Sequence, residues 1–72
     1  MFKVGDEVGW RWASSIATGT VIDVIYEKHQ IISKGKVIIR NGTQKDPAIV
    51  IESNNGSLVI KLAHELQKLI NQ

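Results

Sequence analysis

Cysteine is absent from this chain of 72 residues, and proline occurs only once. Without thiols the chain can form neither a disulfide nor a cysteine-based zinc site, and nothing suggests an oxidising compartment. No apolar run approaches the ~20 residues that cross a bilayer. The first residues, MFKVGDEV, carry acidic side chains early and do not resemble a signal peptide. We therefore expect a cytoplasmic protein that makes no contact with a membrane.

Groups suited to catalysis are also scarce. His29 and His64 are the only histidines, and the pair His64-Glu65 is more typical of a capping or surface position than of a catalytic one. No nucleophile triad, paired carboxylates, phosphate-binding glycine loop or metal-ligand spacing is visible. We therefore expect a protein that is not an enzyme and that has no catalytic residue, metal site or cofactor.

The charge balance is mildly basic, with a net charge of +2 and a pI near 9.2. This balance permits nucleic-acid binding but does not argue for it, because dedicated binders usually carry a denser basic face. The length and the hydrophobic content of 43% are those of one small globular domain spanning residues 1–72.

Two aliphatic runs separated by Asn55-Gly56 predict a β-hairpin from Pro47 to Leu62. A two-residue type I′ turn, with positive φ at both Asn55 and Gly56, would pair Ile51 with Ile60. Strand alternation then predicts one aliphatic face directed toward the core. That face consists of Ile49, Ile51, Leu58, Ile60 and Leu62.

The preceding chain predicts further strands. Residues 7–12 alternate, so that Val8, Trp10 and Trp12 share a face. We expect a loop over 13–18, closed by Gly19, and a second strand over 20–26. In that strand Ile22, Val24 and, at its end, Tyr26 are assigned to the core side. Residues 31–39 are interpreted as one long strand bent at Gly35, and residues 41–46 as an exposed loop.

The last apolar residues recur at helical spacing from Leu62 to Ile70, which predicts a short C-terminal helix, or a single turn, beginning at Ala63. Five short strands with closely spaced turns are typical of a small SH3-like barrel. The predicted fold is therefore mainly β, a five-stranded SH3-like barrel closed at one end by the helix. An OB-fold is the main alternative, although it usually needs a longer chain.

Several stretches, in this order, are similar to a known family. GDEVGWRW followed by GTVIDV resembles the opening of SH3-like barrels of the KOW and Tudor types. With RNGTQKDPAIVIE and GSLVIKLAHEL added, nearly the whole chain resembles a bacterial Tudor-type family named after a hypervirulence-associated protein. Its members are short, often stand-alone, and mostly of uncharacterised function. One departure is Ile49, which occupies a position where the family often has an aromatic residue.

The resemblance implies a first candidate site. Tudor domains in their best-known form bind methylated lysine or arginine in an aromatic cage, because ring faces attract a weakly hydrated cation. The candidate rings are Trp10, Trp12 and Tyr26, with Asp23 or Glu27 as an acidic partner. The alternative is that Trp10 belongs to the core and Trp12 shields the end of the barrel.

A second candidate surface is basic. Its members are Lys34, Lys36, Arg40 and Lys45, with Arg11 added from the first strand. These side chains could contact phosphates while Trp12 or Tyr26 stacks on a base, as in KOW-like barrels. Alternatively, they are solvated charges that protect strand edges from pairing.

Three functions therefore remain open. The first is a binding or adaptor module that recognises a protein or peptide through the aromatic and basic residues. The second is a nucleic-acid-binding barrel that uses Lys34, Lys36, Arg40 and Lys45. The third is a structural subunit, either a monomer or a small homo-oligomer. No partner can be identified from the residues alone.

Overall fold

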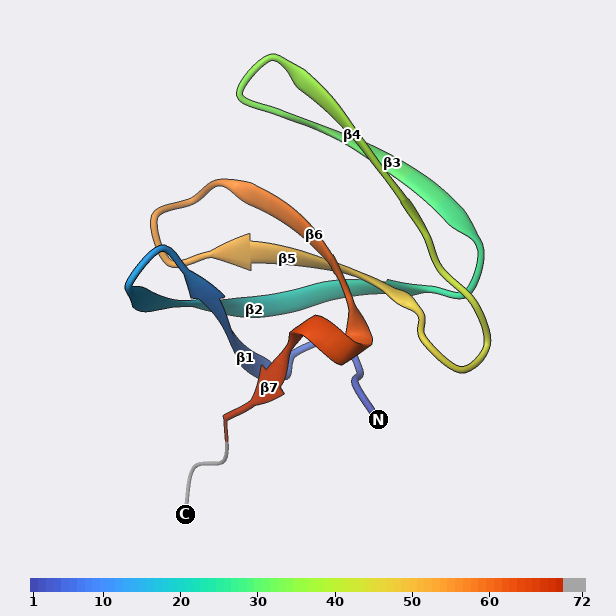
Figure 1. The fold of residues 1–72 in the computed structure, drawn as a ribbon, viewed down its shortest axis with the longest axis horizontal. Helices are drawn as coiled ribbons and strands as arrows, with labels where there is room; N and C mark the ends of the chain where they lie inside the picture. Colours follow the sequence, from blue (N-terminus) through green and yellow to red (C-terminus); the bar gives the residue numbers. More distant parts are fainter. Residues whose placement is uncertain (70–72) are drawn as a thin grey trace.

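A computed structural model describes residues 1–69, and its architecture is mainly β, as predicted. The elements, in chain order, are β1 (Glu7–Trp12), β2 (Ser15–Ile25), β3 (Lys28–Ser33), β4 (Lys36–Asn41), β5 (Ala48–Ser53), β6 (Leu58–Leu62), the 3-10 turn η1 (Ala63–Glu65) and β7 (Gln67–Lys68). The strands form two antiparallel sheets (Figure 1).

The larger sheet has five strands in the order β6-β5-β2-β1-β7, and β3 pairs only with β4. Strands β1, β2, β5 and β6 therefore form a meander, and β7 returns after η1 to pair with β1. The β3–β4 hairpin is an excursion between β2 and β5 that rises away from the larger sheet (Figure 1). Within the described residues the hydrogen-bonded ladders form this open sheet and the separate hairpin, not the closed five-stranded barrel that was predicted.

Strand β5 lies at the centre of the core, because both of its faces are covered. Ile49 and Ile51 pack with Val8, Trp10 and Val21 on one side of the larger sheet. The other face packs in a second cluster, formed by Ala48, Val50, Ile60 and Ile31 of the β3–β4 hairpin. A strand buried on both faces reads as a continuous aliphatic run rather than as an alternation, which accounts for the sequence AIVI.

The predicted β5–β6 hairpin is present, but its register differs by one residue. Ile51 pairs with Val59, not with Ile60, and the N–H of Gly56 donates to the carbonyl of Ser53 at 2.9 Å. Gly56 has a φ of 89°, whereas Asn55 does not have a positive φ. The loop is therefore a three-residue turn with glycine at its left-handed position, not a type I′ turn. Because side chains alternate, this shift moves Leu58, Ile60 and Leu62 to the face opposite Ile49 and Ile51.

The type I′ turn occurs elsewhere, at the tip of the β3–β4 hairpin. Lys34 and Gly35 both have positive φ, at 53° and 78°, and Ser33 pairs with Lys36 across them. Residues 31–39 are therefore two strands, and the prediction of one long bent strand is wrong. Lys-Gly is a weaker turn signal than Asn-Gly, which explains why the sequence pattern placed this turn incorrectly.

Strand β2 is longer than predicted, because residues 15–19 pair with β1 and only Ala13 and Ser14 turn the chain. A β-bulge between Val21 and Asp23 resets its alternation. Val21 is buried, whereas Ile22 is 43% exposed and Tyr26 is 41% exposed. The assignment of Ile22 and Tyr26 to the core is therefore wrong, whereas the half-buried Val24 packs against the cluster that contains Val21, as predicted.

Of the two predicted forms of the C-terminal segment, the structure has the single turn, η1, and not the helix, and β7 follows it. Leu66 already has extended backbone angles, and its side chain packs against the core cluster. Lys68 pairs with Val8, so the larger sheet captures the segment as a strand. Ile70, the last member of the helical pattern, lies outside the described residues. Among residues 1–69, no helix has the length and apolar character needed to span a membrane.

Candidate functional site

A groove of about 450 Å³ runs between the tip of the β3–β4 hairpin, strand β6 and the end of β1. We call it the hairpin groove. The residues that line it include Trp12, Lys34, Lys36, Ile38, Arg40, Leu58, Val59 and Lys61. A smaller hollow of about 220 Å³ shares Trp12 and Lys34 and reaches Ser53 and Asn55 at the β5–β6 loop. The groove therefore joins three strands that are distant in sequence.

Local strand geometry explains how the hairpin contributes to this groove. Ile38 packs on the core side of the hairpin, so alternation directs Lys36 and Arg40 to the same side. The positive φ angles of the type I′ turn place Lys34 at the tip. Lys34 and Lys36 are exposed, whereas Ile38 and Arg40 are half-buried. One face of β4 thus presents a basic, an apolar and a basic side chain in succession.

The two tryptophans of β1 differ sharply in environment. Trp10 is 5% exposed and packs in the core cluster, whereas Trp12 is 66% exposed at the end of the strand. Both rings border the hairpin groove. Trp10 therefore belongs to the core, which was the alternative raised from the sequence, and Trp12 provides an aromatic surface that a ligand can reach.

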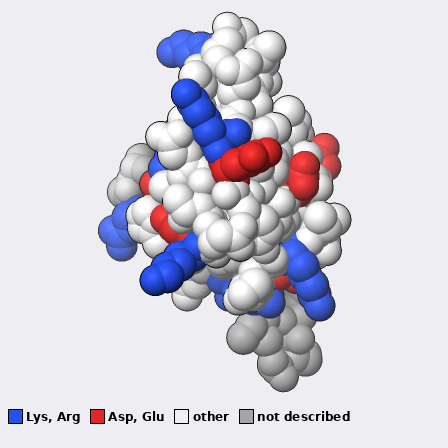
Figure 2. All heavy atoms as spheres, turned by 90° about the vertical axis from the view of Figure 1, so that its right-hand side faces the viewer, with Lys and Arg blue, Asp and Glu red and all other residues white. Residues whose placement is uncertain are grey.

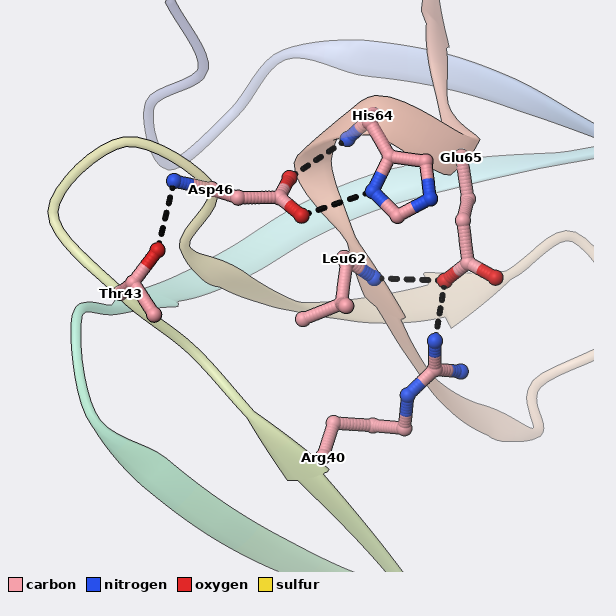
Figure 3. A network of polar contacts seen from close by, with 6 residues as sticks. All are labelled: Arg40, Thr43, Asp46, Leu62, His64 and Glu65. Carbon is pink, nitrogen blue, oxygen red and sulfur yellow. Dashed lines mark hydrogen bonds and ion pairs between the residues drawn. The ribbon is translucent and has the colours of Figure 1, made fainter.

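Arg40 is held by an ion pair within the protein. Its guanidinium donates to Oε1 of Glu65 at 2.6 Å, and the same oxygen accepts the backbone N–H of Leu62 at 2.8 Å (Figure 3). Partial burial by itself raises the pKa of Glu65, but the Leu62 hydrogen bond and the charges of Arg40 and Lys61 outweigh it, so that the pKa lies below its ordinary value of 4.5. Arg40 thus fastens the base of the hairpin to η1.

A second contact joins η1 to the loop that follows β4. Asp46 accepts the backbone N–H of His64 at 2.9 Å, and its second oxygen lies 2.7 Å from Nδ1 of the same histidine (Figure 3). The hydrogen bond to the His64 ring is the main cause that lowers the pKa of Asp46 from its ordinary value of 3.8. The N–H of Asp46 also donates to Thr43 at 3.0 Å. His64-Glu65 therefore serves as a structural connection, consistent with the capping interpretation.

These carboxylates predict how stability depends on pH. The pKa values of Asp46 and Glu65 are lower in the folded chain, so the unfolded chain binds more protons in acid and stability falls as pH falls. We expect the contribution to be complete above about pH 4.5 and to be lost progressively below it. Urea denaturation of the wild type and of Asp46→Asn, at neutral pH and in acid, measures the free energy of unfolding under both conditions. The variant should lose less of this free energy on acidification than the wild type does. Glu27→Gln is the control, and an identical acid response in Asp46→Asn would contradict the assignment.

The remaining candidate residues do not join the hairpin groove. Tyr26 and Lys45 border a separate cavity of about 240 Å³, which Phe2 and Pro47 also line. Arg11 is exposed, and alternation along β1 directs it away from the face of Trp10 and Trp12. The candidate rings Trp10, Trp12 and Tyr26 are therefore not brought together into one cage.

The basic residues are divided in the same way. Lys34, Lys36 and Arg40 meet in the hairpin groove, whereas Lys45 lies at the other cavity. On the face shown in Figure 2, basic and acidic side chains are interspersed, and no continuous basic patch covers it. The sequence reasoning missed Leu58 and Lys61, because the register error misplaced β6. Their proximity to Lys36 depends on the packing of β6 against the hairpin.

Comparison with known proteins gives one match. The family described as hypervirulence associated proteins TUDOR domain matches residues 5–66. No curated protein and no solved structure matches the chain. The match covers all strands from β1 to β6 and the turn η1, and therefore includes every residue of the hairpin groove.

Proposed function

Because the chain belongs to the family of hypervirulence-associated protein Tudor domains, we propose that it is a non-enzymatic binding module that takes an extended protein or peptide segment in the hairpin groove. A Tudor-like family suggests a small binding module, and the groove supplies the surface. The observation that carries the proposal is the Trp12 side chain, which is 66% exposed beside a groove that the strands themselves hold open. The predicted cytoplasmic location stays a prediction.

An exposed tryptophan on a rigid strand is well suited to anchor a ligand. Covering its ring would bury apolar surface worth about 2–4 kcal/mol at ~25 cal/mol per Å². The ring has little side-chain freedom to lose, because it rotates about only two bonds. Interface energies are commonly dominated by such aromatic residues, and their neighbours mainly exclude water. Trp12 is therefore the residue whose loss should weaken binding most.

Trp12→Ala should weaken peptide binding strongly without unfolding the domain. A random displayed library of short peptides, selected on the wild-type chain, should yield binders that lose roughly tenfold or more of their affinity for the variant. Backbone amide shifts from a selected peptide should change at residues 33–40 and 57–61. The reason is that both the anchor and the groove walls contact the ligand.

Arg11→Ala is the matched control, because Arg11 lies on the same strand and faces away from Trp12. It should retain binding. Selected peptides that bind Trp12→Ala as well as they bind the wild type, or that shift amides only around Tyr26 and Lys45, would refute the hairpin groove as the site.

Single-stranded nucleic acid is the second candidate ligand. Trp12 beside Lys34 and Lys36 combines a ring on which a base can stack with cations that can contact phosphates. A labelled oligothymidylate that binds at low salt and is released by salt would support this candidate. A structural role as a subunit or homo-oligomer stays a prediction, which sedimentation of the full chain would test.

A further inference from the structure

The charges of the hairpin groove are all of one sign. Its lining contains Lys34, Lys36, Arg40 and Lys61 and no aspartate or glutamate. Two carboxylates lie next to the lining: Glu65 pairs with Arg40, and Glu52 is opposite Leu58 in the ladder of β5 and β6. On the face shown in Figure 2, acidic and basic side chains are mixed, and the net charge of the chain is only +2. The groove therefore gathers four of the nine basic side chains of the chain and has no acidic side chain in its lining.

The lysines in this groove are available to a ligand. Within residues 1–69, the side chains of Lys34, Lys36 and Lys61 form no recorded ion pair or hydrogen bond, whereas Arg40 is committed to Glu65. Lys34 and Lys36 are exposed. A field of like charge between apolar walls attracts anions and repels cations. A methylated lysine or arginine is therefore the wrong charge for this site.

The surface of the groove between the basic side chains is apolar. Ile38 lies between Lys36 and Arg40 on one wall, and Leu58 and Val59 line the other. On an extended strand, side chains that share a face recur every ~7 Å, so a ligand strand can place an acidic side chain at Lys36 and an apolar one at Ile38. A phosphodiester strand carries its charge along the whole backbone and has no side chains that alternate between charged and aliphatic groups. It would also find one exposed ring here, whereas such sites usually stack several bases.

We infer that the hairpin groove selects an extended acidic peptide in which carboxylates alternate with apolar side chains. The carboxylates contact Lys34, Lys36 and Lys61, and an apolar side chain covers Trp12 and Leu58. This inference rests on the proposed function and adds to it the charge and pattern of the ligand.

The probe is a labelled peptide of alternating glutamate and leucine, compared with versions that carry glutamine or lysine in place of glutamate. Fluorescence anisotropy with the full chain should show the glutamate peptide binding roughly tenfold more tightly than the glutamine peptide, and the lysine peptide not binding. Added salt should reduce the difference in affinity between the glutamate and the glutamine peptide, because salt screens exposed charges. A trimethyl-lysine peptide and an oligothymidylate complete the set.

Charge-reversal variants locate the effect. Lys36→Glu should weaken binding of the glutamate peptide by roughly tenfold, because a negative charge then faces the carboxylate that would contact Lys36. Lys28→Glu is the matched control, since Lys28 lies on the same hairpin, is exposed and faces away from the groove. It changes the net charge equally and should alter binding by less than about twofold. Equal losses in both variants would mean attraction by net charge alone and would overturn the inference.

The other outcomes separate this inference from the proposed function. If the glutamine peptide binds as tightly as the glutamate peptide and still requires Trp12, the proposed peptide-binding function is supported. The inference that the groove prefers an acidic peptide is then wrong. Preference for the lysine or trimethyl-lysine peptide would overturn the inference outright. Tighter binding of the oligothymidylate, dependent on Lys36, would assign the groove to nucleic acid. If no probe shifts the groove amides, both proposals fail.

Discussion

Gly19→Ala is expected to destabilise the fold strongly. A Cβ atom at this position would lie 2.5 Å from the carbonyl oxygen of Glu52, 2.7 Å from Cγ2 of Ile51 and 2.9 Å from Cα of Ser53. Two of these three atoms belong to the backbone of β5, which is buried on both faces, and cannot move without breaking its pairing with β2. We expect a loss of about 3 kcal/mol or more, which is a large part of the 5–15 kcal/mol typical of a native domain. Urea denaturation followed by circular dichroism measures it.

Gly35→Ala is the control for this prediction. Gly35 has a φ of 78°, but an added Cβ there would meet nothing within 4 Å. The cost is therefore only that of a left-handed backbone, about 1–2 kcal/mol. If Gly19→Ala proved no less stable than Gly35→Ala, β2 and β5 would not approach each other as closely as described.

Trp10→Ala is expected to destabilise the fold by about 3–5 kcal/mol, as is usual when a buried aromatic is removed from a core. Its ring packs with Val8, Val21, Ile49 and Ile51 and is 5% exposed. A small domain has no second core large enough to compensate. The midpoint of thermal or urea unfolding measures the loss, and the wild-type protein should show one buried and one exposed tryptophan by fluorescence quenching.

Trp12→Ala, on the same strand, should lower stability by less than about 1 kcal/mol, because its ring is two-thirds exposed. The contrast between the two variants separates a core residue from a binding residue. A Trp12→Ala protein that unfolds as readily as Trp10→Ala would make Trp12 structural, and the hairpin groove would lose its anchor.

Where local patterns decide the structure, the sequence predicted it well. Strand β1, with Val8 and Trp10 buried on one face, follows directly from alternation. The β5–β6 hairpin also follows from two aliphatic runs around a turn. By contrast, the bulge at Ile22 cannot be recognised from the residue types, because isoleucine is found on either face of a strand. The inward residues of β2 were therefore misassigned.

The candidate site was predicted only in part. Trp12, Lys34, Lys36 and Arg40 do meet in one groove, whereas Tyr26 and Lys45 line another cavity. Nothing in the chain between Trp12 and Lys34 indicates that these two residues approach each other. Their proximity depends on how the β3–β4 hairpin packs through Ile31 and Ile38 onto β5 and β6.

The sequence by itself determined strand β1, the existence of the β5–β6 hairpin, the family and the absence of thiol chemistry, because these depend on residue type and on spacing within a few positions. The tertiary structure alone decided the register of β6, the capture of the C-terminal segment as β7 and the one-sided charge of the hairpin groove. A shift of one residue in a turn costs little locally, and it reverses every side chain beyond it. Only packing on both faces of β5 selects between the two registers, and the groove follows from that selection.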